Sequence, residues 1–210
     1  MRDTFIWDAR QRRKEEAEVK LWNDAGRPVP PPHRIKQQIL EGYAANFGTR
    51  ILIETGTFMG DMLYAMKSHF DRLISIELSP ELANKAKTRF IKFSQIEILN
   101  GDSGKMLKSV LQDISQPTLF WLDGHYSSGV TARADLDTPI VAELQTIFSH
   151  PVDNHVILID DARLFNGTDD YPTIPELQAM VQKLKPDYSL SVRNDVIRIH
   201  PQRENLSLTV

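Results

Sequence analysis

Acidic side chains follow each of five short apolar runs in this sequence, at the point where the run ends. They are Glu54, Glu77, Asp102, Asp123 and the pair Asp160 and Asp161. If the runs are strands of one parallel sheet, their carboxyl ends meet along one edge, where open α/β sheets bind ligands. A single acid of this kind often caps a helix or anchors a loop. An acid after every run favours a shared binding site.

The first acid opens a turn that contains two glycines, Glu54-Thr55-Gly56-Thr57-Phe58-Met59-Gly60. Glycine in such a turn lets a ligand approach the backbone closely. The dinucleotide fingerprint G-x-G-x-x-G fails because Phe58 and Asp61 stand at its second and third glycines, and no Gly-Lys-Ser or Gly-Lys-Thr follows as in a Walker loop. Acids flanking the turn suit a cationic ligand better than a pyrophosphate. S-adenosylmethionine (SAM), with a sulfonium and an ammonium, is such a ligand.

The next two acids offer binding groups for a nucleoside. Glu77 ends the second run, where an acid can accept hydrogen bonds from two ribose hydroxyls. Nicotinamide enzymes and SAM enzymes share this feature, so it does not separate them. Asp102 or Ser103, after the third run, could bind the amino group of adenine. Ser103 could equally cap the following helix.

Three carboxylates are expected to converge after the fourth and fifth runs, which are neighbours in the usual strand order of such sheets. They are Asp123, Asp160 and Asp161. Clustered carboxylates raise one another's pKa unless a cation compensates them. Mg²⁺ prefers oxygen ligands of this kind. The alternative is that one aspartate caps a loop and another accepts hydrogen bonds from backbone amides.

The order of these motifs resembles that of class I SAM-dependent methyltransferases. The matching segments are ETGTFMG, SIELSPE, LNGDS, FWLDGHYSSG and LIDDAR, and the resemblance covers about residues 33–200. The motif departs from the usual glycine pattern because Phe58 stands at the second glycine position. In this departure the chain resembles a branch of macrocin- and aminocoumarin-type O-methyltransferases. The resemblance implies cofactor-binding roles for Glu54, Gly56, Thr57, Gly60, Glu77, Asp102 and Ser103.

Metal-dependent members of that family use an acid after strand four and a pair after strand five. The resemblance therefore implies Asp123, Asp160 and Asp161 as ligands of Mg²⁺ or another divalent cation. Such an ion would bind an acceptor hydroxyl and favour its deprotonated form, while Asp123 or His125 takes the proton. We therefore expect O-methylation of a small hydroxylated substrate. His125 could instead be a loop histidine, and a structural role is expected for His33, His69, His150, His155 and His200.

Four other functions compete with this interpretation. A non-catalytic module that binds SAM or a nucleotide, and a metal-dependent hydroxylase on the same scaffold, both stay open. The failed fingerprint disfavours a nicotinamide oxidoreductase. A nucleic-acid methyltransferase is disfavoured because the formal net charge is −3 and because DGHY at 123–126 replaces the N/D-P-P-Y/F tetrad. Nucleic acid and membrane are therefore not expected partners.

The elements that position these residues are short, nearly continuous apolar runs separated by helical stretches, at 50–55, 72–78, 95–99, 118–123 and 155–161. Strands buried on both faces have this pattern, and their alternation with helices predicts a parallel sheet. Two further strands, 188–193 and 196–200, flank Asn194-Asp195 and predict a closing antiparallel hairpin. With the resemblance, this gives a Rossmann-like, doubly wound, mostly parallel seven-stranded sheet in the order 3-2-1-4-5-7-6.

Residues 1–32 are expected to form an arm outside the SAM-binding domain of residues 33–210. Their densely charged stretch predicts a solvated helix, and the prolines at 28, 30, 31 and 32 predict a stiff, extended spacer. The arm is either loosely attached or a lid or homodimer contact anchored by Trp7 and Trp22. The chain lacks cysteine, which excludes disulfides and thiolate metal sites. Its N-terminus lacks the apolar stretch of a signal peptide, and no apolar run approaches the ~20 residues of a membrane span. We therefore expect a cytoplasmic protein.

Overall fold

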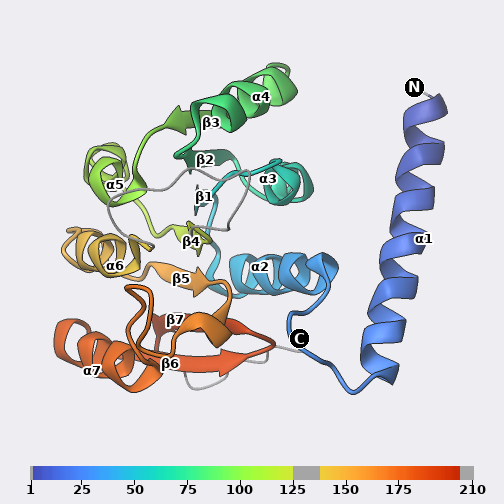
Figure 1. Cartoon of the computed structure of the whole chain (residues 1–210). Coiled ribbons are helices and arrows are strands. Elements are labelled where there is room, and N and C mark those ends of the chain that lie inside the picture. The colour runs from blue at the N-terminus through green and yellow to red at the C-terminus, as the bar shows by residue number, and fades with distance from the viewer. Residues whose placement is uncertain (1, 125–137, 204–210) are drawn as a thin grey trace.

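Seven strands form one sheet in the order β3-β2-β1-β4-β5-β7-β6, which confirms the predicted topology (Figure 1). The computed structural model describes residues 2–124 and 138–203, with side chains from residue 13 onward. The strands are β1 (Ile51–Thr55), β2 (Arg72–Glu77), β3 (Ile96–Asn100), β4 (Leu119–Leu122), β5 (Val156–Ile159), β6 (Tyr188–Arg193) and β7 (Val196–Pro201). Strands β1 to β5 are parallel, and β7 runs antiparallel to both β5 and β6.

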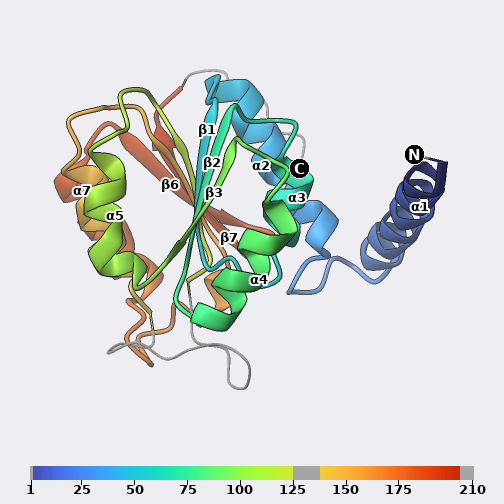
Figure 2. The same ribbon diagram turned by 90° about the horizontal axis from the view of Figure 1, so that it is seen from above.

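Helices cover both faces of the sheet (Figure 2). One face carries α2 (His33–Phe47), α3 (Asp61–Met66) and α4 (Pro80–Phe90), and the other carries α5 (Ser103–Leu111), α6 (Ile140–Phe148) and α7 (Ile174–Leu184). Successive side chains of β4 alternate between the two apolar cores, so that Phe120 packs into one and Trp121 into the other. Both cores need apolar partners, which explains why the central strands are almost uninterrupted apolar runs.

The hairpin β6–β7 closes through the predicted two-residue turn. Asn194 and Asp195 both have positive φ, at 51° and 59°, as a twisted two-residue hairpin turn requires. The turn lies beside the end of β5, because the Ala162 amide donates to the Asp195 carbonyl at 2.9 Å. The short helix Ala162–Leu164 follows directly, so the hairpin and the end of β5 are held together.

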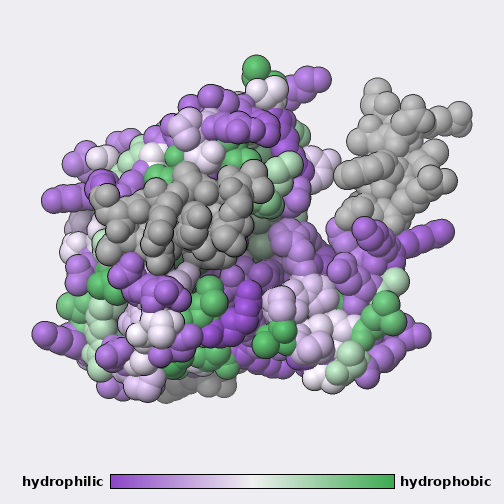
Figure 3. Space-filling model, in the orientation of Figure 1, coloured by the Kyte–Doolittle hydropathy of each residue, from purple (hydrophilic) through white to green (hydrophobic). Residues whose placement is uncertain are grey.

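The N-terminal helix α1 (Arg2–Asp24) stands beside the body of the protein (Figures 1 and 2). Its last turn is attached through Trp22, which is buried in the core under α2 and donates from Nε1 to the Pro28 carbonyl at 2.6 Å. Hydrophilic side chains cover most of the described surface of α1 (Figure 3). The Trp7 side chain lies outside the described residues. Within the described ranges, no helix is long and apolar enough to cross a membrane.

Candidate functional site

The acids that follow β1, β2, β4 and β5 lie along one edge of the sheet. Backbone hydrogen bonds continue past the strand ends, from the Asp123 amide to the Thr55 carbonyl and from the Asp160 amide to the Leu122 carbonyl, both at 3.0 Å. The Gly56 amide likewise donates to the Ile76 carbonyl at 2.9 Å. The structure therefore brings the carboxyl ends and their acids together, because parallel register aligns them.

The turn after β1 requires glycine at both of its glycine positions. Gly56 has φ +85°, and a Cβ atom there would lie 2.3 Å from the Asp123 carbonyl oxygen. Gly60 has φ +77°, and a Cβ atom there would lie 2.7 Å from the Phe90 ring. Phe58 also takes a positive φ, 48°, at the second glycine position of the motif that the sequence resembles. The backbone of the turn therefore has a conformation that favours glycine, although residue 58 is phenylalanine.

Glu77 holds this turn against β2. Its two carboxylate oxygens accept from the backbone amides of Phe58, at 2.8 Å, and Ser79, at 2.9 Å. The Glu77 side chain is buried, and its hydrogen bond from the Phe58 amide helps to stabilise the unusual φ of Phe58. The structure therefore shows Glu77 as a clamp on the turn, and ribose binding by Glu77 stays a prediction.

Glu54 is a buried carboxyl group on β1. It accepts from the Ser75 hydroxyl at 2.5 Å, and that hydroxyl also lies 2.6 Å from Thr57 Oγ1. Burial raises the pKa of Glu54 well above its ordinary value, and the negative charges of Asp123 and Glu77 add to this effect, while the Ser75 bond opposes it. A positively charged ligand would restore the carboxylate, so this position favours a cation.

A pocket of about 330 Å³ opens behind the turn. Its walls include Glu54, Gly56 and Thr57 from the turn, Trp121 and Asp123 from the end of β4, and Asp160 from the end of β5. Two residues of α2, His33 and Lys36, also line the pocket. The pocket thus joins the predicted cofactor turn to the predicted acidic cluster.

Asp102 and Ser103 do not line this pocket. Asp102 is the N-cap of α5, where its side chain accepts from the Gly104 amide at 2.9 Å and pairs with Lys105 at 3.0 Å. The cap at this helix is therefore Asp102 and not Ser103, which corrects the suggestion that Ser103 serves there. Ser103 is buried and hydrogen-bonds Glu143 of α6. Adenine binding by either residue stays a prediction.

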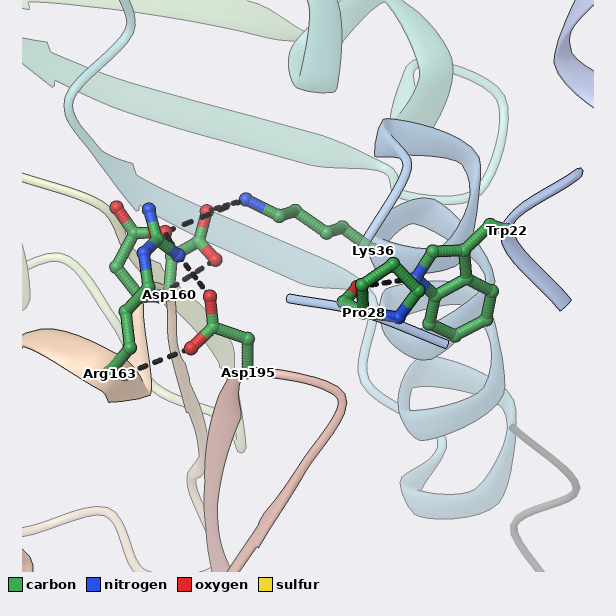
Figure 4. Close-up of polar contacts among 7 residues, drawn as sticks. Trp22, Pro28, Lys36, Asp160, Arg163 and Asp195 are labelled. Carbon is green, nitrogen blue, oxygen red and sulfur yellow. Dashed lines mark hydrogen bonds and ion pairs between the residues drawn. The ribbon is translucent and has the colours of Figure 1, made fainter. Parts of the chain in front are cut away.

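Asp160 and Asp161 are both buried, and each pairs with a basic side chain (Figure 4). The Lys36 ammonium pairs closely with Asp160 Oδ2 and lies 3.9 Å from Asp161 Oδ1. Burial and then the charge of Asp123 raise the pKa of Asp160, while the ammonium opposes this rise. Burial lowers the pKa of Lys36, but Asp160 outweighs it, so that pKa is raised and the lysine keeps its charge.

Arg163 supplies the second basic group. Its guanidinium Nη1 lies 2.7 Å from Asp161 Oδ1 and pairs closely with Asp195 Oδ2, in the hairpin turn (Figure 4). The Arg163 amide also donates to Asp195 Oδ1 at 2.9 Å. Arg163 therefore fastens the hairpin to the end of β5.

The described side chains do not fit the predicted divalent cation. Asp160 Oδ1 accepts the Asp161 amide at 2.8 Å, Oδ2 accepts Lys36, and Asp161 Oδ1 accepts Arg163. Among the residues that the structure describes, no three histidine or acidic side chains are arranged as a metal site. His125 lies outside the described residues. Metal binding by Asp123, Asp160 and Asp161 is therefore not supported by this arrangement and stays a prediction.

His33 and Lys36 are the site residues that sequence reasoning missed. Arg34 donates to Gln37 Oε1 at 3.0 Å, so the Gln37 amide nitrogen donates to His33 Nδ1 at 2.8 Å and leaves the proton on Nε2. Burial lowers the pKa of His33 and so favours its neutral form, in which Nε2 carries the proton and can donate. The available signal was a histidine and a lysine three positions apart at the start of a helix.

Comparison with known proteins gives the fold but no close relative. No protein-family model and no curated protein sequence matches this chain. Its fold is similar to that of an O-methyltransferase from Bacillus cereus in complex with SAH (S-adenosylhomocysteine), at 14% identity and TM-score 0.60, over 89% of this chain and 90% of that one. TomG, an O-methyltransferase of tomaymycin synthesis from Streptomyces achromogenes in complex with SAM, gives 15% identity and TM-score 0.59, over 89% and 87%.

A SAH-bound methyltransferase from Podospora anserina is similar at 17% identity and TM-score 0.56, over 89% of this chain and 88% of that chain. Each of the first two structures covers 89% of this chain. The chain therefore has the Rossmann-like fold of these methyltransferases. Identities this low carry the fold alone, so the chemistry has to be argued from the site.

Proposed function

We propose that this protein is a SAM-dependent methyltransferase that transfers the methyl group to a hydroxyl oxygen of a small molecule. One observation carries the proposal: the pocket of about 330 Å³ joins a glycine turn to a set of buried acids at the carboxyl edge of a methyltransferase-type sheet. Structural neighbours of this fold are recorded with SAM or SAH. The acids of the pocket suit the two positive charges of SAM.

The cofactor is assigned to the turn after β1. Gly56, Thr57 and Gly60 would receive the methionine part, since the bare backbone at Gly56 allows close approach. Glu54 below the turn would supply the negative charge, and a bound ammonium or sulfonium would lower its raised pKa. We assign ribose binding to the lone pairs of the Glu77 carboxylate that its two backbone hydrogen bonds do not use. We assign adenine binding to Asp102 and Ser103, at the start of α5.

Methyl transfer is an in-line displacement at carbon. A lone pair of the acceptor oxygen forms the new bond to the methyl carbon, and the electron pair of the carbon–sulfur bond returns to sulfur. The hydroxyl proton passes to Asp123, which lines the pocket beside the turn. The products are a methylated acceptor and S-adenosylhomocysteine. Positioning the two reactants in line is the main contribution of such a site.

The acceptor is proposed to be small and hydroxylated. The limited volume of the pocket, about 330 Å³, favours a compact acceptor, and the net charge of −3 disfavours a nucleic-acid substrate. The resemblance to macrocin- and aminocoumarin-type O-methyltransferases points the same way. A metal-assisted form of the reaction would require Lys36 to leave Asp160, and no step above depends on a metal.

Calorimetric titration with SAM tests the cofactor assignment. Wild type and the control Glu97→Gln, an exposed carboxylate that pairs with Arg72, are expected to bind SAM alike. Glu77→Gln should weaken binding at least tenfold, because the amide cannot hold both the Phe58 and Ser79 amides. Absence of SAM binding by wild type would refute the proposal. Release of S-adenosylhomocysteine with a panel of sugars and phenols then separates an enzyme from a silent binding module.

A further inference from the structure

A positive charge belonging to the protein itself lies in the acidic cluster (Figure 4). Lys36 reaches from α2, which packs across β4 and β5, to Asp160 at the end of β5. The two side chains are only 15% and 3% exposed, so this is an inward-facing ion pair and not a surface contact. Figure 4 shows Lys36 extended toward Asp160 from the opposite side to Arg163.

A divalent cation at this place would compete with Lys36 for the same oxygen atoms. Mg²⁺ needs close to six oxygen ligands in near-octahedral geometry. Asp160 already accepts at both oxygens, from Lys36 and from the Asp161 amide, and Asp161 accepts from Arg163. Repulsion between the ammonium and a doubly charged ion only a few ångströms away would add to the cost. The donor set therefore fits a lysine better than a metal.

We propose that the Lys36 ammonium is the resident cation of this site, so that methyl transfer proceeds without a metal ion and Lys36 hydrogen-bonds the acceptor oxygen. The inference rests on the proposed methyltransferase function. An ammonium carries three donors, and the pairs with Asp160 and Asp161 use at most two. Lys36 lines the same pocket as Glu54 and Gly56, and we assign its remaining donor to an acceptor oxygen bound there.

Methyl transfer needs the positive charge of Lys36 while the acceptor hydroxyl loses its proton. As the hydroxyl proton passes to Asp123, the acceptor oxygen gains negative charge, and the ammonium beside it stabilises that charge. The oxygen lone pair then forms the bond to the methyl carbon, and the carbon–sulfur electron pair stays on sulfur. Asp160 fixes the direction of the lysine and is a positioning residue. Removing one donor of this kind typically lowers kcat about 10²–10³-fold.

Uptake of Mn²⁺ tests the inference without any methyl acceptor. Free Mn²⁺ is followed by its paramagnetic resonance signal as protein is added. Wild type and the control Lys85→Met, an exposed lysine paired with Glu81, are expected to leave the signal unchanged. Lys36→Met should reduce it, because the carboxylates lose their cation and attract another. SAM titration of each variant reports whether the pocket is still folded.

Two results would overturn the inference. One is uptake of Mn²⁺ by wild type that Asp160→Asn abolishes, since a metal would then be the resident cation. The other is a Lys36→Met variant that binds SAM but takes up no Mn²⁺, since the carboxylates would then form no cation site. If Lys36→Met does not fold, the wild-type result alone decides. Failure of wild type to bind SAM would refute the methyltransferase and leave the Mn²⁺ result standing.

Turnover supplies a separate measurement once the panel gives an acceptor. Wild type is expected to keep its rate after treatment with a chelator, and Lys36→Met to lose about 100-fold in kcat. Lys36→Arg, which keeps the charge, should recover part of this loss. A chelated wild type that becomes inactive and recovers with Mg²⁺ would contradict metal-free transfer.

Discussion

Glu143 of α6 is fully buried beneath Ser103, and its replacement by glutamine should make the protein more stable at neutral and higher pH. One of its carboxyl oxygens has no hydrogen-bond partner among the described residues. Burial raises its pKa from 4.5 to about 7, although a hydrogen bond with Ser103 opposes the rise. Glutamine has the same shape and carries no charge to desolvate.

The size and sign of the effect follow from the two pKa values. Between the unfolded value of 4.5 and the folded value of about 7, the folded state holds a proton that the unfolded state has lost. Stability therefore falls as the pH rises through this interval, and above it the charged form stays buried at a cost. Each pKa unit corresponds to about 1.4 kcal/mol, so the whole interval amounts to roughly 3 kcal/mol.

Denaturant unfolding at about pH 5 and about pH 8 measures this contribution. The difference in unfolding free energy, Glu143→Gln minus wild type, should increase by about 2–3 kcal/mol from the lower to the higher pH. The control is Glu81→Gln, where Lys85 lowers the pKa of an exposed carboxylate, and there the change should be small and of opposite sign. Equal differences at both pH values for Glu143→Gln would refute the reasoning.

Three further outcomes test the turn and the arm. Gly56→Ala should abolish measurable SAM binding in calorimetry, because its Cβ atom would lie 2.3 Å from the Asp123 carbonyl oxygen; wild-type affinity in that variant would contradict the close packing. SAM affinity should rise with pH as Glu54 loses its proton, since the carboxylate is the form that binds a cation, and Glu54→Gln should show a flatter profile. Trp22→Ala should speed proteolysis in residues 25–32, because the helix α1 loses its buried anchor and its bond to Pro28; unchanged cleavage would show that the anchor is not needed.

The sheet could be predicted because its signals are local. Runs such as 118–123 are apolar at nearly every position, which identifies strands buried on both faces. Asn194-Asp195 between two short strands gave the hairpin, and the resemblance to a known family gave the strand order, which the structure confirms. The acids at the strand ends could be assigned to one edge, because parallel strands place their carboxyl ends together.

The cationic partners of those acids could not be predicted. Lys36 and Asp160 are 124 positions apart in the sequence, and only the packing of α2 across β4 and β5 brings them into contact. Local patterns contain no information on which helix crosses that edge. The acids themselves suggested a metal as their compensating charge, whereas the structure places an ammonium there.

The sequence by itself determined the strands, the edge that gathers the acids and the glycine turn, because each depends on neighbouring residues and on the geometry of parallel strands. Only the tertiary structure decided what those acids contact. Glu77 clamps the Phe58 turn, Asp160 holds Lys36, and burial in the core raises the pKa of Glu143 to about 7. A carboxyl group takes its partner and its pKa from the residues that folding brings around it, and these residues come from distant parts of the chain.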